Sequence, residues 1–212
     1  MAIPILCIGK SGTGKSTSLR NFGVDEVGVI NVLGKPLPFK SQLRTVVTDD
    51  YIEVYGILKK AKSNVLVIDD AGYLMTNQFM RGHSSTGKGN DIFAFYNAIA
   101  DSYWKLIQFV IHTIPPEKTV YFMMHEDKND LGDAKPKSIG KMLDEKVCIE
   151  GMFTIVLRSC LDDGKYCFKT QSDGFDVCKS PMGMFEGKLI DNDLKQVDAA
   201  IRAYWEIKDA QS

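Results

Sequence analysis

The residues with the clearest chemistry form a glycine-rich segment near the amino terminus, GKSGTGKS at positions 9–16. This pattern, G-x-x-x-x-G-K-[ST], is typical of loops that hold nucleotide phosphates. Its glycines let successive backbone N–H groups face inward, while Lys15 reaches the β- and γ-phosphates and Ser16 offers a hydroxyl to Mg²⁺. The predicted nucleotide-binding residues are Gly9, Lys10, Ser11, Gly12, Thr13, Gly14, Lys15, Ser16 and Thr17.

Two acidic residues follow the apolar run Val65–Ile68, which predicts a buried strand. Asp69 would lie at the carboxyl end of that strand, beside the glycine-rich loop, and would hold Mg²⁺ through water. The alternative for Asp69 is a helix cap after an ordinary core strand. Asp70 has two interpretations that the sequence leaves open: it polarises the water that attacks the γ-phosphate, or it caps the next helix.

His125 ends another apolar run, Thr119–Met124, and is a candidate for contact with the γ-phosphate; a purely structural histidine is the alternative. The polar segment after it contains four lysines that are candidates for contacts with DNA phosphates: Lys128, Lys135, Lys137 and Lys141. Acidic residues in the same segment dilute their charge, and no aromatic residue alternates with them as a base-stacking platform requires. A solvated loop is the competing interpretation.

Composition excludes several classes of protein. The chain has 212 residues, of which 44% are hydrophobic and 25% charged, as in ordinary globular proteins. Its 26 basic and 27 acidic residues exclude a strongly basic surface over the whole molecule, but not a local basic patch. No apolar run reaches the roughly 20 residues of a membrane-spanning helix, and the run Met1–Ile8 is too short for a signal-peptide core. These features predict a cytoplasmic protein with no membrane partner.

Apolar runs and amphipathic patterns alternate along the chain. The predicted strands are Ile3–Ile8, Val27–Leu33, Leu43–Val47, Asn64–Ile68, Thr119–Met124, Phe153–Leu157 and Tyr166–Thr170. The predicted helices are Lys15–Phe22, a helix capped by Asp49 or Asp50 that runs to about Ala61, a long helix capped by Asp91 and ended by Pro115, Ser138–Lys146 and Asp191–Ile207. The predicted loops include Arg81–Asn90 and Glu126–Lys137.

This alternation predicts an α/β fold with a largely parallel, buried central sheet and a carboxyl-terminal hairpin. We expect residues 1–190 to form one nucleotide-binding domain, with a helix in residues 191–212 packed on it.

The order of motifs resembles a known family. A strand followed by GKSGTGKS, then VLVIDDAGYL, a strand ending in VYFMMH and a β-hairpin resembles the RecA-like branch of P-loop ATPases. More narrowly, the chain resembles the small phage-encoded ATP-binding proteins with a single RecA-like AAA domain, over Ile3 to about Phe185. The resemblance implies a P-loop NTPase fold with a three-layer RecA-like sandwich, and a Mg²⁺-dependent ATPase.

The resemblance also implies a role and partners. Members of this group act in phage DNA recombination, repair or replication, some in single-strand annealing or pairing. The expected partners are ATP, single-stranded DNA, a phage single-strand-binding or recombination protein, and further copies of the chain in a homo-oligomer in the host cytoplasm.

Two departures from the family pattern affect the predicted chemistry. The strand after the glycine-rich loop reads GVINVLGK and lacks the usual catalytic Glu, so either Asp70 substitutes for it or hydrolysis is slow. The K-x-R-x-G finger of hexameric relatives is replaced by KSPMG at positions 179–183, which keeps Lys179 but has Pro181 in place of Arg. Lys179 is therefore a candidate finger for a neighbouring subunit or a solvated surface lysine, and Arg158 is a second cationic candidate.

Two other functions compete with an ATPase. A P-loop kinase for a small molecule usually carries an arginine-rich lid, and no arginine occurs between Pro115 and Lys146. A non-catalytic module that binds a partner protein under nucleotide control is favoured by the missing Glu.

Overall fold

The computed structural model describes residues 1–140 and 142–208. The strands in this part of the chain are β1 Ile3–Gly9, β2 Val27–Asn31, β3 Thr45–Val47, β4 Val65–Asp69, β5 Thr119–Lys128, β6 Ala134–Pro136, β7 Ile155–Asp162, β8 Lys165–Lys169 and β9 Leu189–Asp191. The helices are η1 Ser16–Asn21, α1 Tyr51–Lys60, α2 Gly72–Gly82, α3 Asn90–Thr113, η2 Met142–Val147, η3 Ile149–Met152 and α4 Leu194–Tyr204.

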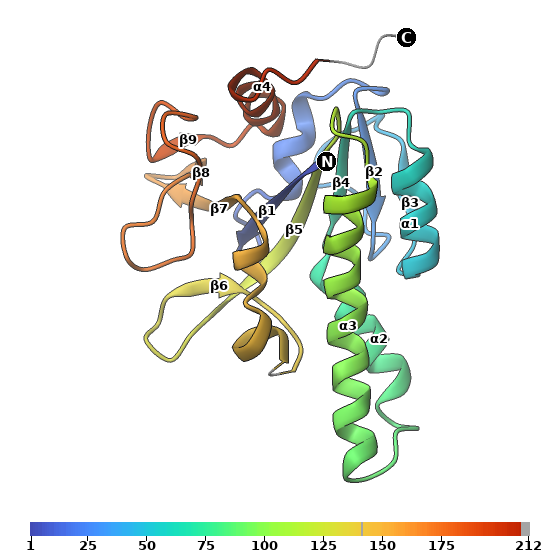
Figure 1. Ribbon diagram of the computed structural model, residues 1–212. Helices are drawn as coiled ribbons and strands as arrows, with labels where there is room; N and C mark the ends of the chain where they lie inside the picture. Colours follow the sequence, from blue (N-terminus) through green and yellow to red (C-terminus); the bar gives the residue numbers. More distant parts are fainter. Residues whose placement is uncertain (141, 209–212) are drawn as a thin grey trace.

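All nine strands join one sheet in the order β3-β2-β4-β5-β1-β7-β8-β9, with β6 paired to the end of β5 (Figure 1). The six strands from β3 to β7 in this order are mutually parallel, and β6, β8 and β9 pair antiparallel. The largely parallel α/β sheet expected from the sequence is therefore confirmed. Because parallel strands end at one edge, the segments that follow β1, β4 and β5 lie close together there.

Alternate side chains of the central strands enter two separate apolar cores, one on each face of the sheet. Leu6 and Ile8 of β1 pack with residues of α1, α2 and α3. Ile5 and Cys7 face the opposite side and pack with residues of η1 and α4. This period of two, with both faces apolar, is what a strand covered on both sides requires. The sheet therefore lies between two helical layers.

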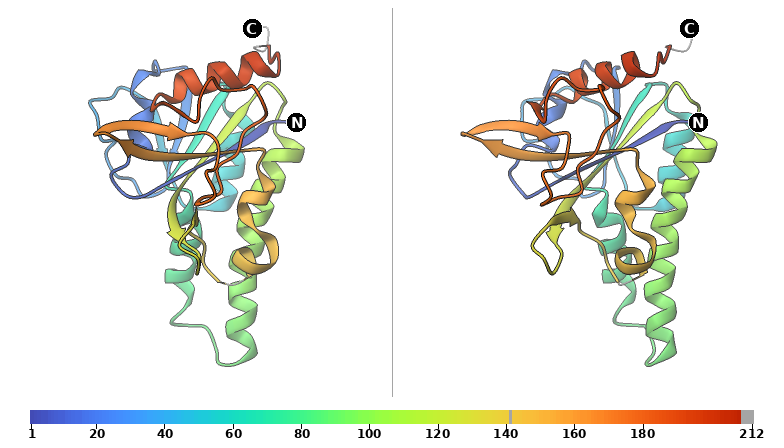
Figure 2. Two further views of the ribbon diagram at one scale, coloured as in Figure 1. Left: turned by 90° about the vertical axis from the view of Figure 1, so that its left-hand side faces the viewer. Right: turned by 60° about the vertical axis from the view of Figure 1, so that its left-hand side comes forward.

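Helices α2 and α3 form a pair that extends beyond the carboxyl edge of the sheet (Figure 2). The sequence analysis expected a helix after Asp70 but gave it no bounds, and residues 81 and 82, expected to belong to a loop, lie in the last turn of α2. The expected cap of α3 was also wrong, because α3 begins at Asn90 after Gly89, so that Asp91 lies within the first turn. Ile92 is exposed because this end of α3 has no sheet beneath it, whereas Ile99 and Tyr103 are fully buried.

The carboxyl-terminal hairpin is confirmed and extended. Strands β7 and β8 pair around a two-residue turn at Asp163 and Gly164, both with positive φ, as a tight hairpin turn requires. Strand β9, which the sequence analysis missed, adds to β8. The expected loop Glu126–Lys137 is instead partly a second hairpin, because β5 continues to Lys128 and pairs with β6. The expected helix 138–146 is only partly present: residues 138–140 are not helical, position 141 lies outside the described residues, and Met142–Val147 form the π-helix η2.

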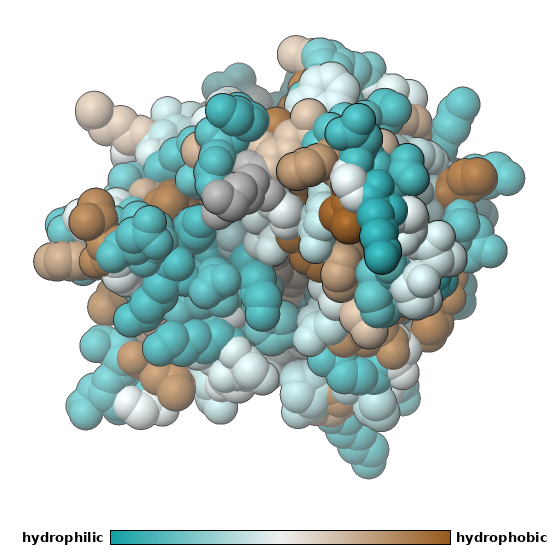
Figure 3. All heavy atoms as spheres, turned by 90° about the horizontal axis from the view of Figure 1, so that it is seen from below, coloured by the Kyte–Doolittle hydropathy of each residue, from teal (hydrophilic) through white to brown (hydrophobic). Residues whose placement is uncertain are grey.

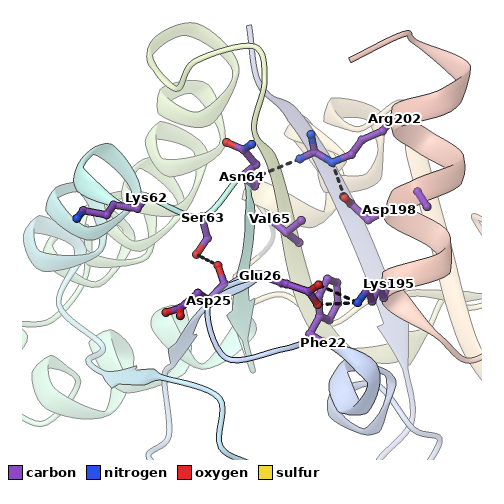
Figure 4. Close-up of a pocket in the computed structure, with 11 residues that line it drawn as sticks. Phe22, Asp25, Glu26, Lys62, Ser63, Asn64, Val65, Lys195, Asp198 and Arg202 are labelled. Atoms are coloured by element: carbon purple, nitrogen blue, oxygen red, sulfur yellow. Dashed lines mark hydrogen bonds and ion pairs between the residues drawn. The ribbon is translucent and has the colours of Figure 1, made fainter. Parts of the chain in front are cut away.

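Helix α4 is anchored to the amino ends of the strands by a polar network that lines a pocket of about 420 Å³ (Figure 4). The buried Asp198 carboxylate accepts hydrogen bonds from the hydroxyls of Thr119 and Tyr121 at 2.6 and 2.8 Å, and from Arg202 Nε at 2.6 Å. Lys195 pairs with Glu26 at 2.7 Å. The charged groups of this network pair with one another or accept hydrogen bonds from neighbouring hydroxyls, as expected of contacts that stabilise a fold.

Helix α4 begins at Leu194, capped by Asp193, three residues later than the sequence suggested. Residues 209–212 of the predicted terminal segment lie outside the described residues. Within residues 1–140 and 142–208, no helix is long and apolar enough to cross a membrane.

Candidate functional site

A cleft of about 490 Å³ opens at the carboxyl edge of the sheet, where β1, β4 and β5 end. Its walls combine the glycine-rich loop with residues from four other parts of the chain. The lining residues are Ser11, Gly12, Gly14, Lys15, Ser16, Thr17, Lys35, Pro36, Pro38, Asp69, Asp70, His125 and Tyr166. The structure thus brings most of the predicted site residues to one place.

The glycine-rich loop has the conformation that its sequence predicts. Gly12 and Gly14 have φ values of 80° and 96°, a region that side chains disfavour. The N–H groups of these two glycines make no hydrogen bond within the described part of the chain. Thr13 fixes the loop, because its hydroxyl contacts the Lys10 carbonyl at 2.8 Å and the Ser159 hydroxyl of β7 at 2.7 Å. The loop therefore holds free amide donors in a defined shape, as an anion site requires.

Lys15 is buried beneath this loop. Its ammonium donates to the carbonyls of Gly9 and Lys10, at 2.7 and 2.9 Å. Burial lowers the pKa of Lys15 from its ordinary value, and the charges of Asp70 and Asp69 only partly oppose this. A phosphate would restore a charge partner to this ammonium.

The helix after the loop differs from the expectation. Residues Ser16–Asn21 form the 3₁₀ helix η1 instead of an α-helix over 15–22. Its six residues are too few for a sizeable helix dipole, so the amides and Lys15 must supply most of the positive potential in the cleft.

The Ser16 hydroxyl donates to Asp69 Oδ1 at 2.9 Å and links the loop to the end of β4. Burial raises the pKa of Asp69, and the neighbouring Asp70 charge raises it further. Among residues 1–140 and 142–208, no group of three or more His, Cys, Asp and Glu side chains could hold a metal ion alone. One hydroxyl and one carboxylate fit a Mg²⁺ ion that takes its other ligands from phosphate oxygens and water.

Asp70 is held in an unusual backbone conformation, with φ of 59°. Its carboxylate pairs with Lys35 at 2.7 Å and lies 3.4 Å from Nε2 of His125. Burial acts to raise the pKa of Asp70, but the hydrogen bonds from His125 and Lys35 outweigh it and hold the pKa below its ordinary value. Helix α2 follows without a side-chain cap, so the alternative in which Asp70 caps that helix is wrong.

Sequence reasoning missed three residues of this region. Lys35 comes from the proline-containing segment after β2, Tyr166 from β8, and Asn192 from the turn between β9 and α4. The Asn192 side chain lies against Gly14 and Tyr166. No local motif marks any of the three, although the glycine and prolines around Lys35 indicate a loop at the end of a strand.

The two other cationic candidates lie away from the cleft lining. Lys179 forms an antiparallel bridge with Val156, near the middle of the sheet, and is absent from the cleft lining. Arg158 makes a two-pronged contact with Glu126, at 2.7 and 2.8 Å, and lies 3.8 Å from Asp176. The guanidinium of Arg158 is therefore already paired with carboxylates of its own chain.

The predicted DNA-contacting lysines are dispersed. Lys128 is exposed at the end of β5, and Lys135 lies opposite Asp127 in the β5–β6 pair. Lys137 lines a second, more apolar hollow of about 530 Å³, which also contains Tyr73, Phe79 and Met80. Lys141 lies outside the described residues.

The face at the carboxyl edge is largely hydrophilic, with scattered apolar patches (Figure 3). The second hollow adjoins the first, because Ser11 and His125 line both. Comparison with models of protein families and with curated proteins finds none that matches this chain.

Proposed function

We propose that this protein is a P-loop NTPase with a RecA-like fold that binds Mg²⁺ and ATP and hydrolyses ATP slowly. The observation that carries the proposal is the Ser16–Asp69 hydrogen bond beside the buried Lys15. It joins two motifs that lie 53 positions apart in the chain. The parallel sheet with this loop at its carboxyl edge, and the β7–β8 hairpin, support the same fold.

Different residues would bind the phosphates and the metal ion. The free amides of Gly12 and Gly14 and the Lys15 ammonium would hold the β- and γ-phosphates, and Lys15 would exchange the loop carbonyls for phosphate oxygens. Ser16 and Asp69 would hold Mg²⁺, Asp69 through water. The metal, when bound, neutralises charge on the phosphate oxygens.

Asp70 and His125 are the residues proposed to act on the attacking water. The Asp70 carboxylate would accept a hydrogen bond from the water and orient it toward the γ-phosphate. Its lowered pKa makes it a weak base, which supports slow turnover. His125, within reach of Asp70, would contact the γ-phosphate, and Lys35 would supply positive charge from the same chain.

We further propose that the protein acts in the cytoplasm, in phage DNA recombination, repair or replication, as a homo-oligomer in which Lys179 reaches the site of a neighbour. The position of Lys179 outside its own cleft supports a role in trans. Lys128, Lys135, Lys137 and Lys141 are the proposed contacts to single-stranded DNA.

A small-molecule kinase is the second candidate, because the hollow beside His125 is large enough for an acceptor. Transfer of the γ-phosphate to a nucleoside or sugar acceptor, in preference to water, would favour it. Nucleotide binding without any turnover would favour the switch module instead.

The direct test replaces Lys15. The variant Lys15→Ala should fold and lose ATP binding in calorimetry, whereas Lys59→Ala, which changes an exposed lysine on α1, should bind like the wild type. Equal ATP affinity in Lys15→Ala and in the wild type would refute the proposed nucleotide site.

A further inference from the structure

The side-chain amide of Asn192 is buried and makes no hydrogen bond among the described residues. Asn192 is only 1% exposed, and neither Oδ1 nor Nδ2 of its side chain has a hydrogen-bond partner among residues 1–140 and 142–208. Among the described residues, it is the only one with two buried, unpaired side-chain polar atoms. Buried amides are almost always hydrogen-bonded, because their transfer from water is otherwise unfavourable. The unpaired amide of Asn192 therefore indicates that its hydrogen-bond partner comes from a bound molecule.

The unpaired amide lies directly against the glycine-rich loop. A Cβ atom at position 14 would lie 3.1 Å from Asn192 Oδ1 and 2.9 Å from Cδ1 of Tyr166. The backbone N–H of Asn192 donates to the Tyr166 carbonyl at 3.3 Å, so the two residues are tied together. Only glycine at position 14 allows this approach.

The Tyr166 ring lies against Gly14, as the Asn192 amide does. Tyr166 also lines the cleft and is 47% exposed. Within residues 1–140 and 142–208, no hydrogen bond restrains its side chain. Asn192 does not itself line the cleft, so a bound base would reach its amide only if the Tyr166 ring turned aside.

Tyr166 and Asn192 lie on the side of the cleft where the base of a bound nucleotide is expected. Asp69 and His125 lie on the side of β1 that carries β5 and β4, where the γ-phosphate and metal would be. Tyr166 and Asn192 lie on the opposite side, next to β7 and β8. Arg20 donates to the carbonyls of both Thr17 and Asn192, which joins this end to the segment after Ser16. The base of a nucleotide with its phosphates on Lys15 would extend toward this side.

We propose that Asn192 and Tyr166 form a binding site for the adenine base, an inference that rests on the proposed nucleotide site. Oδ1 of Asn192 accepts a hydrogen bond from the 6-amino group, and Nδ2 donates to a neighbouring ring nitrogen. Tyr166 stacks on the base. At N6 and N7 adenine offers a donor beside an acceptor, whereas guanine offers two acceptors, O6 and N7, so an amide turned either way would leave one of its atoms unpaired on guanine.

The test compares probes that differ only at the base. Calorimetry of the wild type should give tighter binding of ATP than of GTP or of purine riboside triphosphate, which lacks the 6-amino group, by roughly 10- to 100-fold. The variant Asn192→Leu keeps the size of the side chain and removes both polar atoms. It should bind the three nucleotides within about threefold of one another and bind inorganic tripolyphosphate as the wild type does.

A second readout separates base recognition from a structural role. Because Asn192→Leu removes two unpaired buried polar atoms, the nucleotide-free variant should melt at the same or a higher temperature than the wild type. A lower melting temperature would show that the amide supports the fold, and would overturn the proposal.

Tyr166 is tested with a matched control. Tyr166→Phe should keep the affinity for ATP, and Tyr166→Ala should lose roughly tenfold or more. Tyr204→Ala, at a residue 42% exposed on α4, should change nothing. If ATP binding depends on Lys15 but its ratio to GTP binding is unchanged in Asn192→Leu, the base site is wrong and the nucleotide site stands. If the wild type binds no ATP, the proposed function itself fails.

Discussion

Asp70 offers a way to separate backbone strain from side-chain chemistry. It has φ of 59°, a left-handed conformation that is unfavourable for residues with a Cβ. Strained residues of this kind concentrate at functional sites. The substitutions Asp70→Gly and Asp70→Ala both remove the carboxylate, but only glycine removes the strain. The difference in stability between these two variants is therefore the strain less the conformational entropy that glycine loses on folding.

The magnitude follows from the surroundings of Asp70. Left-handed backbone costs about 1–2 kcal/mol in alanine, and glycine gives back about 0.5–1 kcal/mol through its freer unfolded chain. The Asp70→Gly variant should therefore be more stable than Asp70→Ala by about 1 kcal/mol. Loss of the Lys35 pair affects both variants equally and contributes little, since Lys35 is 59% exposed. For a domain of this length, the gap corresponds to roughly 2–4 °C in melting temperature.

Urea unfolding and phosphate release together provide the assay. Both variants should keep ATP affinity and lose about 10²-fold in kcat, because each removes the group that orients water. Asp163→Gly is the matched control, since Asp163 also has positive φ but lies in the exposed β7–β8 turn. It should gain stability and keep full activity.

Two results would refute this reasoning. If Asp70→Ala is more stable than Asp70→Gly by the roughly 0.5–1 kcal/mol that glycine loses through its freer unfolded chain, the backbone at position 70 is not strained. If either variant turns over ATP at the wild-type rate, Asp70 does not act on the water, and His125 or Lys35 must be examined instead.

The remaining predictions concern the metal, the neighbour and pH. Asp69→Ala should weaken Mg²⁺ binding to the ATP complex by about 10- to 100-fold, measured by titration of Mg²⁺ at fixed ATP; an unchanged affinity would remove Asp69 from the metal site. Lys179→Ala should lower ATPase activity per chain, and mixing it with Lys15→Ala should restore some activity; flat activity on dilution and no restoration would place the whole site in one chain. Asp176, whose burial acts to raise its pKa but whose bond to Lys169 outweighs this, has a lowered pKa. Its contribution is therefore present above the ordinary pKa of an aspartate, about 3.9, and is lost as pH falls through the lowered pKa, so the stability difference between wild type and Asp176→Asn should shrink on acidification below about pH 4 in urea titrations, and a constant difference would contradict the assignment.

Local patterns predicted the parts of the fold that depend on neighbours in sequence. The strand before the glycine-rich loop, the strand that ends at Asp69 and the hairpin around Asp163 each have their own short-range signal, and each is observed. Helix α2 was given no bounds because its segment begins and ends with glycine, a poor helix former. Strand β5 was predicted too short because its last residues are polar and lie past the core.

Long-range placement could not be predicted in the same way. Nothing near Lys35 in sequence indicates that its ammonium meets Asp70, because the loop that carries it is fixed only by the finished sheet. No sequence motif marks Asn192, and its contact with Gly14 depends on the pairing of β8 with β9. The residues of the glycine-rich loop could be predicted because a local sequence motif marks them. Lys35 and Asn192 were missed because their positions depend on segments that lie far away in the sequence.

The position of β1 has a consequence for how the chain folds. Both neighbours of β1 come from far along the sequence, since Ile3 pairs with Thr119 and Ile5 with Ile155. The pairs β2–β4 and β7–β8 join segments much closer together. Closing such long loops is slow, and during synthesis β1 has no partner until more than half of the chain has left the ribosome. We therefore expect the glycine-rich loop, which extends from β1, to acquire its shape late in folding, after the segments around it have begun to assemble.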